Sequence, residues 1–262
     1  MIAMDRTPGQ GPDLAIDGPL ATLTLRRPEV ANRLEPSDLD TLDEQLKTVD
    51  ATPGVLVLRL RGEGRHFCSG FNIGRMDGEG GGAQAGARFE AIAAALEQAR
   101  PVTIAEVHGG AYGGATDLAL ACDFRLGSMA AEMQVPAARL GLLFYGGGLE
   151  RFVSRLGLQA AKQVLLMAQK LTAQEMLACG FLDRLHPTGA ELRADVEALS
   201  HQLAGMAPLA LLGMKKHLNR IASGTLDAEA LARDIAQCSA SADLREGSLA
   251  WRHKRAPAFA GR

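Results

Sequence analysis

The sequence predicts an α/β domain that continues into a helical C-terminal third. Two runs rich in β-branched residues and leucine, 54–62 and 102–109, are typical of strands that are covered on both faces of a sheet. Segments with helical spacing of apolar residues lie between such runs, and strands that alternate with helices favour a parallel or mixed sheet. From about residue 147 onward the patterns are mainly helical.

The composition allows a sizeable core and points away from several classes of partner. Of the 262 residues, 47% are hydrophobic and 22% are charged, which is typical of a folded domain. The net charge is −2 and no basic run stands out, so nothing indicates a nucleic-acid or membrane-surface partner. No apolar run reaches the roughly 18 residues that a membrane-spanning helix needs.

The first half of the chain carries further strand and helix signals. The run 20–28 predicts a strand that Pro28 ends, and 36–50 predicts a helix with Ser37 as its N-cap. The segment 118–127 passes from a helical to a strand-like pattern. These elements extend the alternation that predicts the sheet.

A segment rich in Gly and Ala, 76–90, has the composition of a phosphate-binding loop. However, no GxGxxG pattern fits it, and no GxxxxGK[ST] pattern occurs in the chain. We therefore predict a mobile surface loop at 76–90, and the missing phosphate loops disfavour a nucleotide-dependent enzyme.

The helical third opens with a capping-box pattern from Thr172 to Glu175 and a terminal glycine at Gly180. Three amphipathic helices are then expected, at 191–206, 208–220 and 225–243.

The chain divides into three parts without a linker that demands a second independent domain. We predict a flexible N-terminal tail over 1–12, a core over 13–200 and a helical region over 201–262. The start of the chain lacks the cationic and apolar segments of a signal peptide. The four cysteines show no CxxC spacing and are expected to be reduced, mostly core thiols, so we predict a cytoplasmic protein.

Two glycine-containing turns carry the first chemical signal. Ser69-Gly70 follows the strand 54–62, and Gly113-Gly114 stands where a helix would begin. The first N–H groups of a helix have no internal partner, and glycine lets a ligand approach the backbone closely. Two such donors on one oxygen stabilise an oxyanion or enolate, each contributing on the order of 3 kcal/mol.

A carboxylate lies close to the second turn. Asp117 follows Gly114 by three residues, nearly one helical turn, so its side chain can point to the side of that N–H. These residues suggest a carbonyl held by the backbone, with a carboxylate nearby for proton transfer. A close packing seam of Gly and Ala between helices is the alternative explanation of the same letters.

Six motifs, in order, resemble the crotonase superfamily, which is typified by enoyl-CoA hydratases and isomerases. They are RPEVANRL (27–34), FCSGFNIGRM (67–76), VHGGAYGGATDLALACD (107–123), VPAARLGLLFYGGGLERFVSRLG (135–157), LTAQEMLACGFLDRL (171–185) and LAWRHKRAPAF (249–259). The second resembles the family pattern FxAGxDL, and the third resembles VxGxAxGGGxELALxCD. The similarity runs from about Leu14 to Phe259, and six ordered motifs make it specific.

The resemblance implies a crotonase-like spiral of ββα units with a C-terminal helical trimerisation region, assembled as a homotrimer or homohexamer. It implies an acyl-CoA thioester as substrate, whose carbonyl lies between the backbone N–H groups of Phe71 and Gly114. Ser69 and Gly70, just before Phe71, are expected to contact this substrate too. Coenzyme A enters with the substrate, so no separate cofactor is expected, and no cluster has the spacing of metal ligands.

The resemblance also assigns residues to the coenzyme A part of the substrate. The turn around Val30 and Ala31 looks like the backbone ledge for coenzyme A. Lys254 matches the tail lysine that meets the phosphate region of coenzyme A. Trp251 stands where an aromatic or apolar residue is usual.

Departures from the family pattern bear on mechanism. Typical hydratases use two glutamates, but the first position is Asp117 here and the second is Ala137, which cannot transfer protons. The family's PGxGG is FYGGG here, which brings Tyr145 toward the acyl pocket. We therefore predict that Asp117 and Tyr145 handle protons or water in the hydration of a 2-enoyl-CoA.

Other reactions of the superfamily stay open, namely decarboxylation, isomerisation or hydrolysis of an acyl-CoA. A CoA-ester binding protein with little activity is the alternative from a different class, because it would keep the backbone clamp and lose the acid pair. Four side chains near the motifs are weaker candidates for catalysis, with structural or solvated roles expected: His66, Tyr112, Glu132 and Glu150.

Overall fold

The computed structural model describes residues 10–72 and 81–262, and that part of the chain contains two sheets. The larger sheet has the order β1-β2-β3-β4-β6-β9, with β1 antiparallel to β2 and all other neighbours parallel. Its strands are β1 (Asp13–Asp17), β2 (Leu20–Leu25), β3 (Val57–Gly62), β4 (Val102–Val107), β6 (Phe124–Ser128) and β9 (Arg184–His186). The smaller sheet has the order β5 (Gly110–Tyr112), β7 (Glu132–Gln134) and β8 (Leu171–Thr172).

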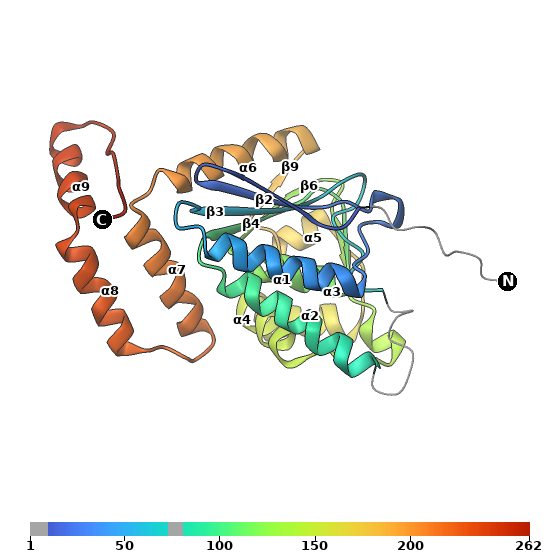
Figure 1. Ribbon diagram of the computed structural model, residues 1–262. Helices are drawn as coiled ribbons and strands as arrows, with labels where there is room; N and C mark the ends of the chain where they lie inside the picture. The colour runs from blue at the N-terminus through green and yellow to red at the C-terminus, as the bar shows by residue number, and fades with distance from the viewer. Residues whose placement is uncertain (1–9, 73–80) are drawn as a thin grey trace.

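Helices cover both faces of the larger sheet (Figure 1). On one side lie α1 (Pro36–Asp50), α2 (Gly81–Gln98), α3 (Gly114–Ala121) and α4 (Gly146–Leu166), and on the other lies α6 (Gly189–Ala204). The short helices are α5 (Ala173–Ala178) and the 3-10 turns η1 (Pro28–Val30) and η3 (Ala137–Leu140). The C-terminal helices α7 (Pro208–Ala222), α8 (Ala228–Ala240) and α9 (Ala242–His253) extend beyond the sheet.

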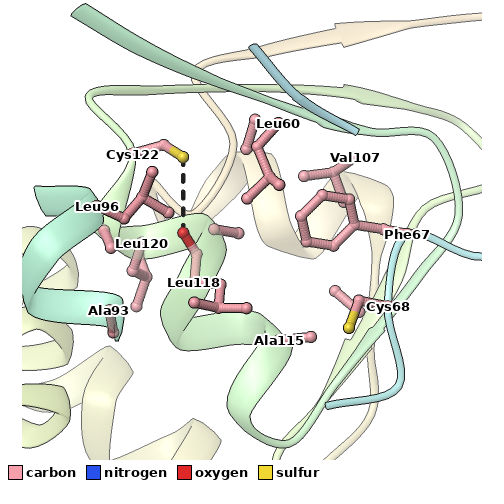
Figure 2. Close-up of a cluster of buried hydrophobic side chains, with 14 of the residues drawn as sticks. Leu60, Phe67, Cys68, Ala93, Leu96, Val107, Ala115, Leu118, Leu120 and Cys122 are labelled. Carbon is pink, nitrogen blue, oxygen red and sulfur yellow. Dashed lines mark hydrogen bonds between the residues drawn. The ribbon is translucent and has the colours of Figure 1, made fainter. Parts of the chain in front are cut away.

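Two apolar clusters hold these layers together. The larger lies between the sheet and α1 to α4, and Figure 2 shows part of it, with Phe67, Val107 and Leu118 among the labelled side chains. The smaller joins the opposite face of β3 and β4 to α6. Strand β4 is buried at every position, so it is covered on both faces as predicted, whereas β3 is covered on both faces only at its start, because Arg59 is half-buried and Arg61 is exposed.

Some predicted helix ends agree with those of the structure. The helix predicted at 36–50 is α1, and Thr172 and Glu175 form the predicted capping box of α5. The N-cap prediction of Ser37 is wrong, because α1 begins at Pro36 and Ser37 lies inside the helix. Proline suits the first helical position, since its fixed φ is already helical and it has no N–H to satisfy.

Two differences have local causes. The helix predicted at 225–243 is two helices, because Ser241 is extended and caps α9 by accepting the Leu244 N–H at 3.0 Å. Strand β1 was not predicted from the sequence, since it is an edge strand with mostly exposed side chains and lacks an apolar pattern.

The loop predicted at 76–90 is helical where the structure describes it, because α2 begins at Gly81. The first part of that segment, 76–80, lies outside the described residues. Phe89 and Leu96 of α2 are buried in the larger cluster. This tertiary packing outweighs the low helix propensity of the glycines, so the loop prediction is wrong for residues 81–90.

The predicted boundary at residue 200 falls inside α6. Leu199 and Leu203, on either side of it, pack in the same cluster against the sheet. Helix α6 therefore belongs with the sheet, and the helical extension begins with α7. Of the tail predicted over 1–12, residues 1–9 lie outside the described part of the chain.

Candidate active site

The two predicted glycine turns touch each other. Gly70 has a φ of +83°, and a Cβ added to it would lie 2.7 Å from the Tyr112 carbonyl oxygen and 3.1 Å from the Gly114 nitrogen. Only glycine allows both this backbone conformation and this approach. The turn that leads to Phe71 therefore packs directly on the start of α3.

The Phe71 N–H points away from the segment that supports its turn. Leu34 donates its N–H to the Gly70 carbonyl at 2.9 Å and accepts the Asn72 N–H at 2.9 Å. Leu34 and Phe71 thus form a parallel bridge, in which the N–H of Phe71 faces the other side. Within the described residues this N–H donates no hydrogen bond.

Gly114 provides a second N–H. It is the first residue of α3, where N–H groups have no partner along the helix and the helix dipole is positive. Gly113 precedes it as the N-cap with a φ of +55° and donates its own N–H to the Gln134 carbonyl at 2.9 Å. The Gly114 N–H, like that of Phe71, has no partner among the residues that the structure describes.

Phe71 and Gly114 both line a cavity of about 460 Å³. Its wall is mainly apolar and includes Phe89, Pro136, Leu140, Leu142, Leu143 and Phe144. The polar side chains among the described lining residues are Ser69, Glu90, Tyr112 and Tyr145. An apolar wall keeps the local dielectric low, so two N–H dipoles act more strongly on an oxygen there than in water.

Asp117 is fully buried behind this cavity and is held by two other side chains. Arg151 donates from Nε to Oδ1 at 2.8 Å and from Nη2 to Oδ2 at 2.7 Å, and Tyr145 donates its hydroxyl to Oδ2 at 2.7 Å. Asp117 is not among the described residues that line the cavity. The geometry therefore does not favour the predicted proton-transfer role of Asp117, because both of its oxygens already accept charge-assisted bonds.

Arg151 extends this contact into a buried ionic network. Its Nη1 donates to Glu97 Oε2 at 2.9 Å, and Arg155 Nη2 donates to Glu97 Oε1 at 2.7 Å. Burial alone would lower the pKa of Arg151, but the bonds and charge of Asp117, and then those of Glu97, raise that pKa above its ordinary value. The network ties α2, α3 and α4 together behind the cavity.

Tyr145 caps the start of α4 and forms part of the cavity wall. Its ring stacks on that of Phe144 with centroids 4.7 Å apart and lies 6.1 Å from that of Phe89. Burial, then the charge of Asp117 and the hydrogen bond to it, raises the pKa of Tyr145 above its ordinary value. The predicted catalytic hydroxyl is thus placed at the cavity but already donates its proton to Asp117.

Glu90 carries the only carboxylate among the described residues that line the cavity. It lies on α2 next to Phe89, and its Oε1 accepts the N–H of Gly147, in the first turn of α4, at 2.7 Å. Glu90 is not among the predicted site residues, because it falls within the loop that the sequence predicts at 76–90. If the segment that ends in RFEAIAAALEQ is taken as a helix, Glu90 lies on that helix directly after Phe89, whose side chain is buried.

A match to a protein family shows which family the chain belongs to. The family described as Enoyl-CoA hydratase/isomerase matches residues 16–262. The chain belongs to the enoyl-CoA hydratase/isomerase family. The predictions of a crotonase-like fold and of an acyl-CoA enzyme of this type are therefore confirmed.

Relatives of this family member span nearly its whole length. It is 31% identical over 247 residues to a probable enoyl-CoA hydratase of Rhodobacter capsulatus, covering 93% of this chain and 95% of the relative. It is 28% identical over 260 residues to a peroxisomal Delta(3,5)-Delta(2,4)-dienoyl-CoA isomerase of Arabidopsis thaliana, covering 93% and 94%. A crystal structure of an enoyl-CoA hydratase/carnithine racemase from Magnetospirillum magneticum matches with a TM-score of 0.90 and 27% identity, covering 97% and 96%.

In this enoyl-CoA hydratase/isomerase family member the turn around Val30 and Ala31 lies against the turn that contains Ser69 and Gly70. Ser69 donates its N–H to the Ala31 carbonyl at 2.8 Å and its hydroxyl to the Val30 carbonyl at 3.2 Å. Ala31 has a φ of +55°, and Asn32 holds the turn through its side chain, which donates to the carbonyl of His66 at 2.8 Å. Val30 and Ala31 thus contact Ser69, which lines the cavity, but they are not themselves among its described lining residues.

Tyr112 also lines the cavity, but its hydroxyl is engaged. It donates to Glu132, which lies opposite Gly110 in the β5–β7 register, and Glu132 pairs with Lys170 Nζ at 2.6 Å. The Tyr112 ring folds over Gly110, where any Cβ would collide with it. Burial and then the bond to Glu132 raise the pKa of Tyr112 to about 12. Glu132, expected to be solvated, is therefore a paired carboxylate.

Trp251 and Lys254 are not brought to the cavity of their own chain. Trp251 lies on α9 and is 86% exposed, and Lys254 follows at the end of that helix. Figure 1 shows α8 and α9 beyond α7, at the opposite end from the N-terminus of α2. Neither residue is among the described residues of the chain that line this cavity.

Two further observations concern metal ions and membranes. Among residues 10–72 and 81–262, no group of three or more His, Cys, Asp or Glu side chains could hold a metal ion. In the same part of the chain, each helix is too short or too polar to cross a membrane.

Proposed function

We propose that this protein binds the thioester of an acyl-CoA in the 460 Å³ cavity and hydrates a 2-enoyl-CoA. The observation that carries the proposal is the pair of unpartnered N–H groups, Phe71 and Gly114, on one apolar cavity within the described residues. When water adds to the β-carbon, the electron pair of the double bond moves onto the thioester oxygen. Two N–H donors stabilise that negative charge, and each is worth on the order of 3 kcal/mol.

The proposed reaction needs no separate cofactor. The oxygen of water bonds to the β-carbon, a base takes one proton from that water, and an acid delivers a proton to the α-carbon. The thioester supplies the electron sink, so the residues need only bind, orient and transfer protons.

Isomerisation of an enoyl-CoA is the second candidate. The observation that favours it is the single carboxylate among the described cavity residues, since Ala137 offers no second one. Moving a double bond requires removal of one α-proton and its return at the γ-carbon, which one base can perform through the same enolate.

A direct assay tests both candidates against a non-catalytic binding protein. The purified protein is incubated with crotonyl-CoA, and loss of the conjugated thioester absorbance reports hydration. With 3-butenoyl-CoA, a gain of that absorbance reports isomerisation. Tight binding of both esters without turnover would support the binding protein instead.

A Tyr145→Phe variant tests whether Tyr145 transfers protons to the substrate. Because its hydroxyl already donates to Asp117 and has a raised pKa, we expect kcat to fall by less than about tenfold, below the usual effect of losing an acid–base group. Steady-state kinetics measure this. A fall of a thousandfold with unchanged folding would restore the original prediction for Tyr145.

We also propose that the helical extension assembles the protein into a trimer or hexamer in the cytoplasm. Exposed apolar side chains of α7 to α9 line a groove of about 960 Å³, among them Met214, Leu218, Ile235 and Trp251. Burial of such a face by another copy is favourable. Assembly would also bring Trp251 and Lys254 to another chain, where their predicted contacts with coenzyme A could form. The four free cysteines are compatible with a reducing compartment.

A further inference from the structure

The cavity contains a carboxylate that the family motifs do not assign. Glu90 extends from α2, whose preceding residue Phe89 packs against Gly114, since a Cβ on Gly114 would lie 2.6 Å from that ring. Glu90 itself turns to the other side of the cavity, toward the start of α4. One helix thus contributes neighbouring side chains to the start of α3 and to the opposite wall.

Only one oxygen of Glu90 is used in the fold. Oε1 accepts the Gly147 N–H at 2.7 Å, whereas Oε2 has no hydrogen-bond partner within the described residues. A Cβ on Gly147 would lie 3.1 Å from Oε1, so the glycine run FYGGG leaves room for this carboxylate. The Gly147 bond fixes the direction of the side chain and leaves the second oxygen available to a ligand.

The other polar groups at the cavity are already committed. The hydroxyls of Tyr112 and Tyr145 donate to buried or paired carboxylates, and that of Ser69 donates to a backbone carbonyl. Asp117 is enclosed by Arg151 and Tyr145. Among the described lining residues, Glu90 is therefore the acid–base side chain that has an oxygen left for proton exchange with a ligand.

We propose that Glu90 is the acid–base residue of this enzyme, an inference that rests on the proposed function. In hydration, Oε2 takes a proton from water as the water oxygen bonds to the β-carbon. The resulting carboxylic acid then delivers a proton to the α-carbon, and the enolate electron pair forms the new C–H bond. In isomerisation the same oxygen removes the α-proton and returns it to the γ-carbon, so atoms and charges balance in both cases.

The Glu90→Gln variant separates this role from a purely structural one. Its amide oxygen can still accept the Gly147 N–H, so the cap of α4 is retained while proton transfer is lost. We expect kcat with crotonyl-CoA or 3-butenoyl-CoA to fall by at least about 10²-fold, with KM changed by less than about threefold. We also expect deuterium incorporation at the α-carbon of 3-butenoyl-CoA in D₂O to fall by at least the same factor.

The matched control is Glu150→Gln, which changes an exposed glutamate on α4 and should leave both rates unchanged. If the wild type turns over or exchanges and Glu90→Gln keeps its rate, the Glu90 proposal is overturned while the proposed function stands. If the wild type neither turns over nor exchanges either ester, the proposed function fails, and the role of Glu90 fails with it.

Discussion

An Arg151→Met variant is expected to lose about 3–5 kcal/mol of its free energy of unfolding. Arg151 is 3% exposed and neutralises Asp117, which is fully buried, through two hydrogen bonds. Methionine fills a similar volume but leaves the carboxylate with Tyr145 as its remaining partner. An uncompensated buried charge is among the most costly single changes in a protein. Urea denaturation followed by circular dichroism measures the loss.

Two further variants show whether the loss comes from the buried charge. Arg233→Met removes a cation whose contact with Glu229 is exposed and 3.7 Å long, and it should change stability by less than about 0.5 kcal/mol. Combining Arg151→Met with Asp117→Leu removes both charges and should recover part of the stability. A double variant less stable than Arg151→Met would contradict this explanation.

A Gly70→Ala variant is expected to lower kcat/KM by about 10²- to 10³-fold, the usual effect of removing one oxyanion donor. The new Cβ would lie 2.7 Å from a backbone carbonyl and 3.1 Å from the Gly114 nitrogen, at a φ of +83°. The turn must therefore move away from α3, which separates the two N–H groups. Steady-state kinetics with the substrate identified in the turnover assay measure the effect.

Gly189→Ala is the matched control for this change. Gly189 lies in the first turn of α6, has no positive φ, and a Cβ there meets nothing within 4 Å. Its activity should equal that of the wild type. Full activity in a folded Gly70→Ala protein would show that the two N–H groups need not lie close together.

The sequence predicted the layers and the glycine turns because both are local signals. Continuous apolar runs identified β3 and β4, and turn glycines preceding a helical run identified the start of α3. The partner of Asp117 could not be predicted in this way. A carboxylate inside an apolar helix requires a cation, but Arg151 is 34 positions away and 28 Lys and Arg residues compete for the role.

Glu90 escaped prediction for a different physical reason. The first turns of its helix contain glycines, which have a low helix propensity, and the packing of Phe89 and Leu96 helps to stabilise α2. The spacing of residues near the start of the helix does not predict such tertiary contacts. The carboxylate becomes a candidate only when α2 and α4 are seen to meet at the cavity.

The ionic network behind the cavity has an implication for which acyl groups are admitted. Asp117 and Glu97 balance Arg151 and Arg155, so the four formal charges cancel and none is left to attract a distant anion. No Lys, Arg or His stands among the described lining residues, and Glu90 adds a negative charge. If the acyl group of the substrate enters this cavity as proposed, a tail that ends in a carboxylate would find no counter-ion, whereas a hydrocarbon tail would contact leucine and phenylalanine side chains. We therefore expect the cavity to select uncharged acyl chains.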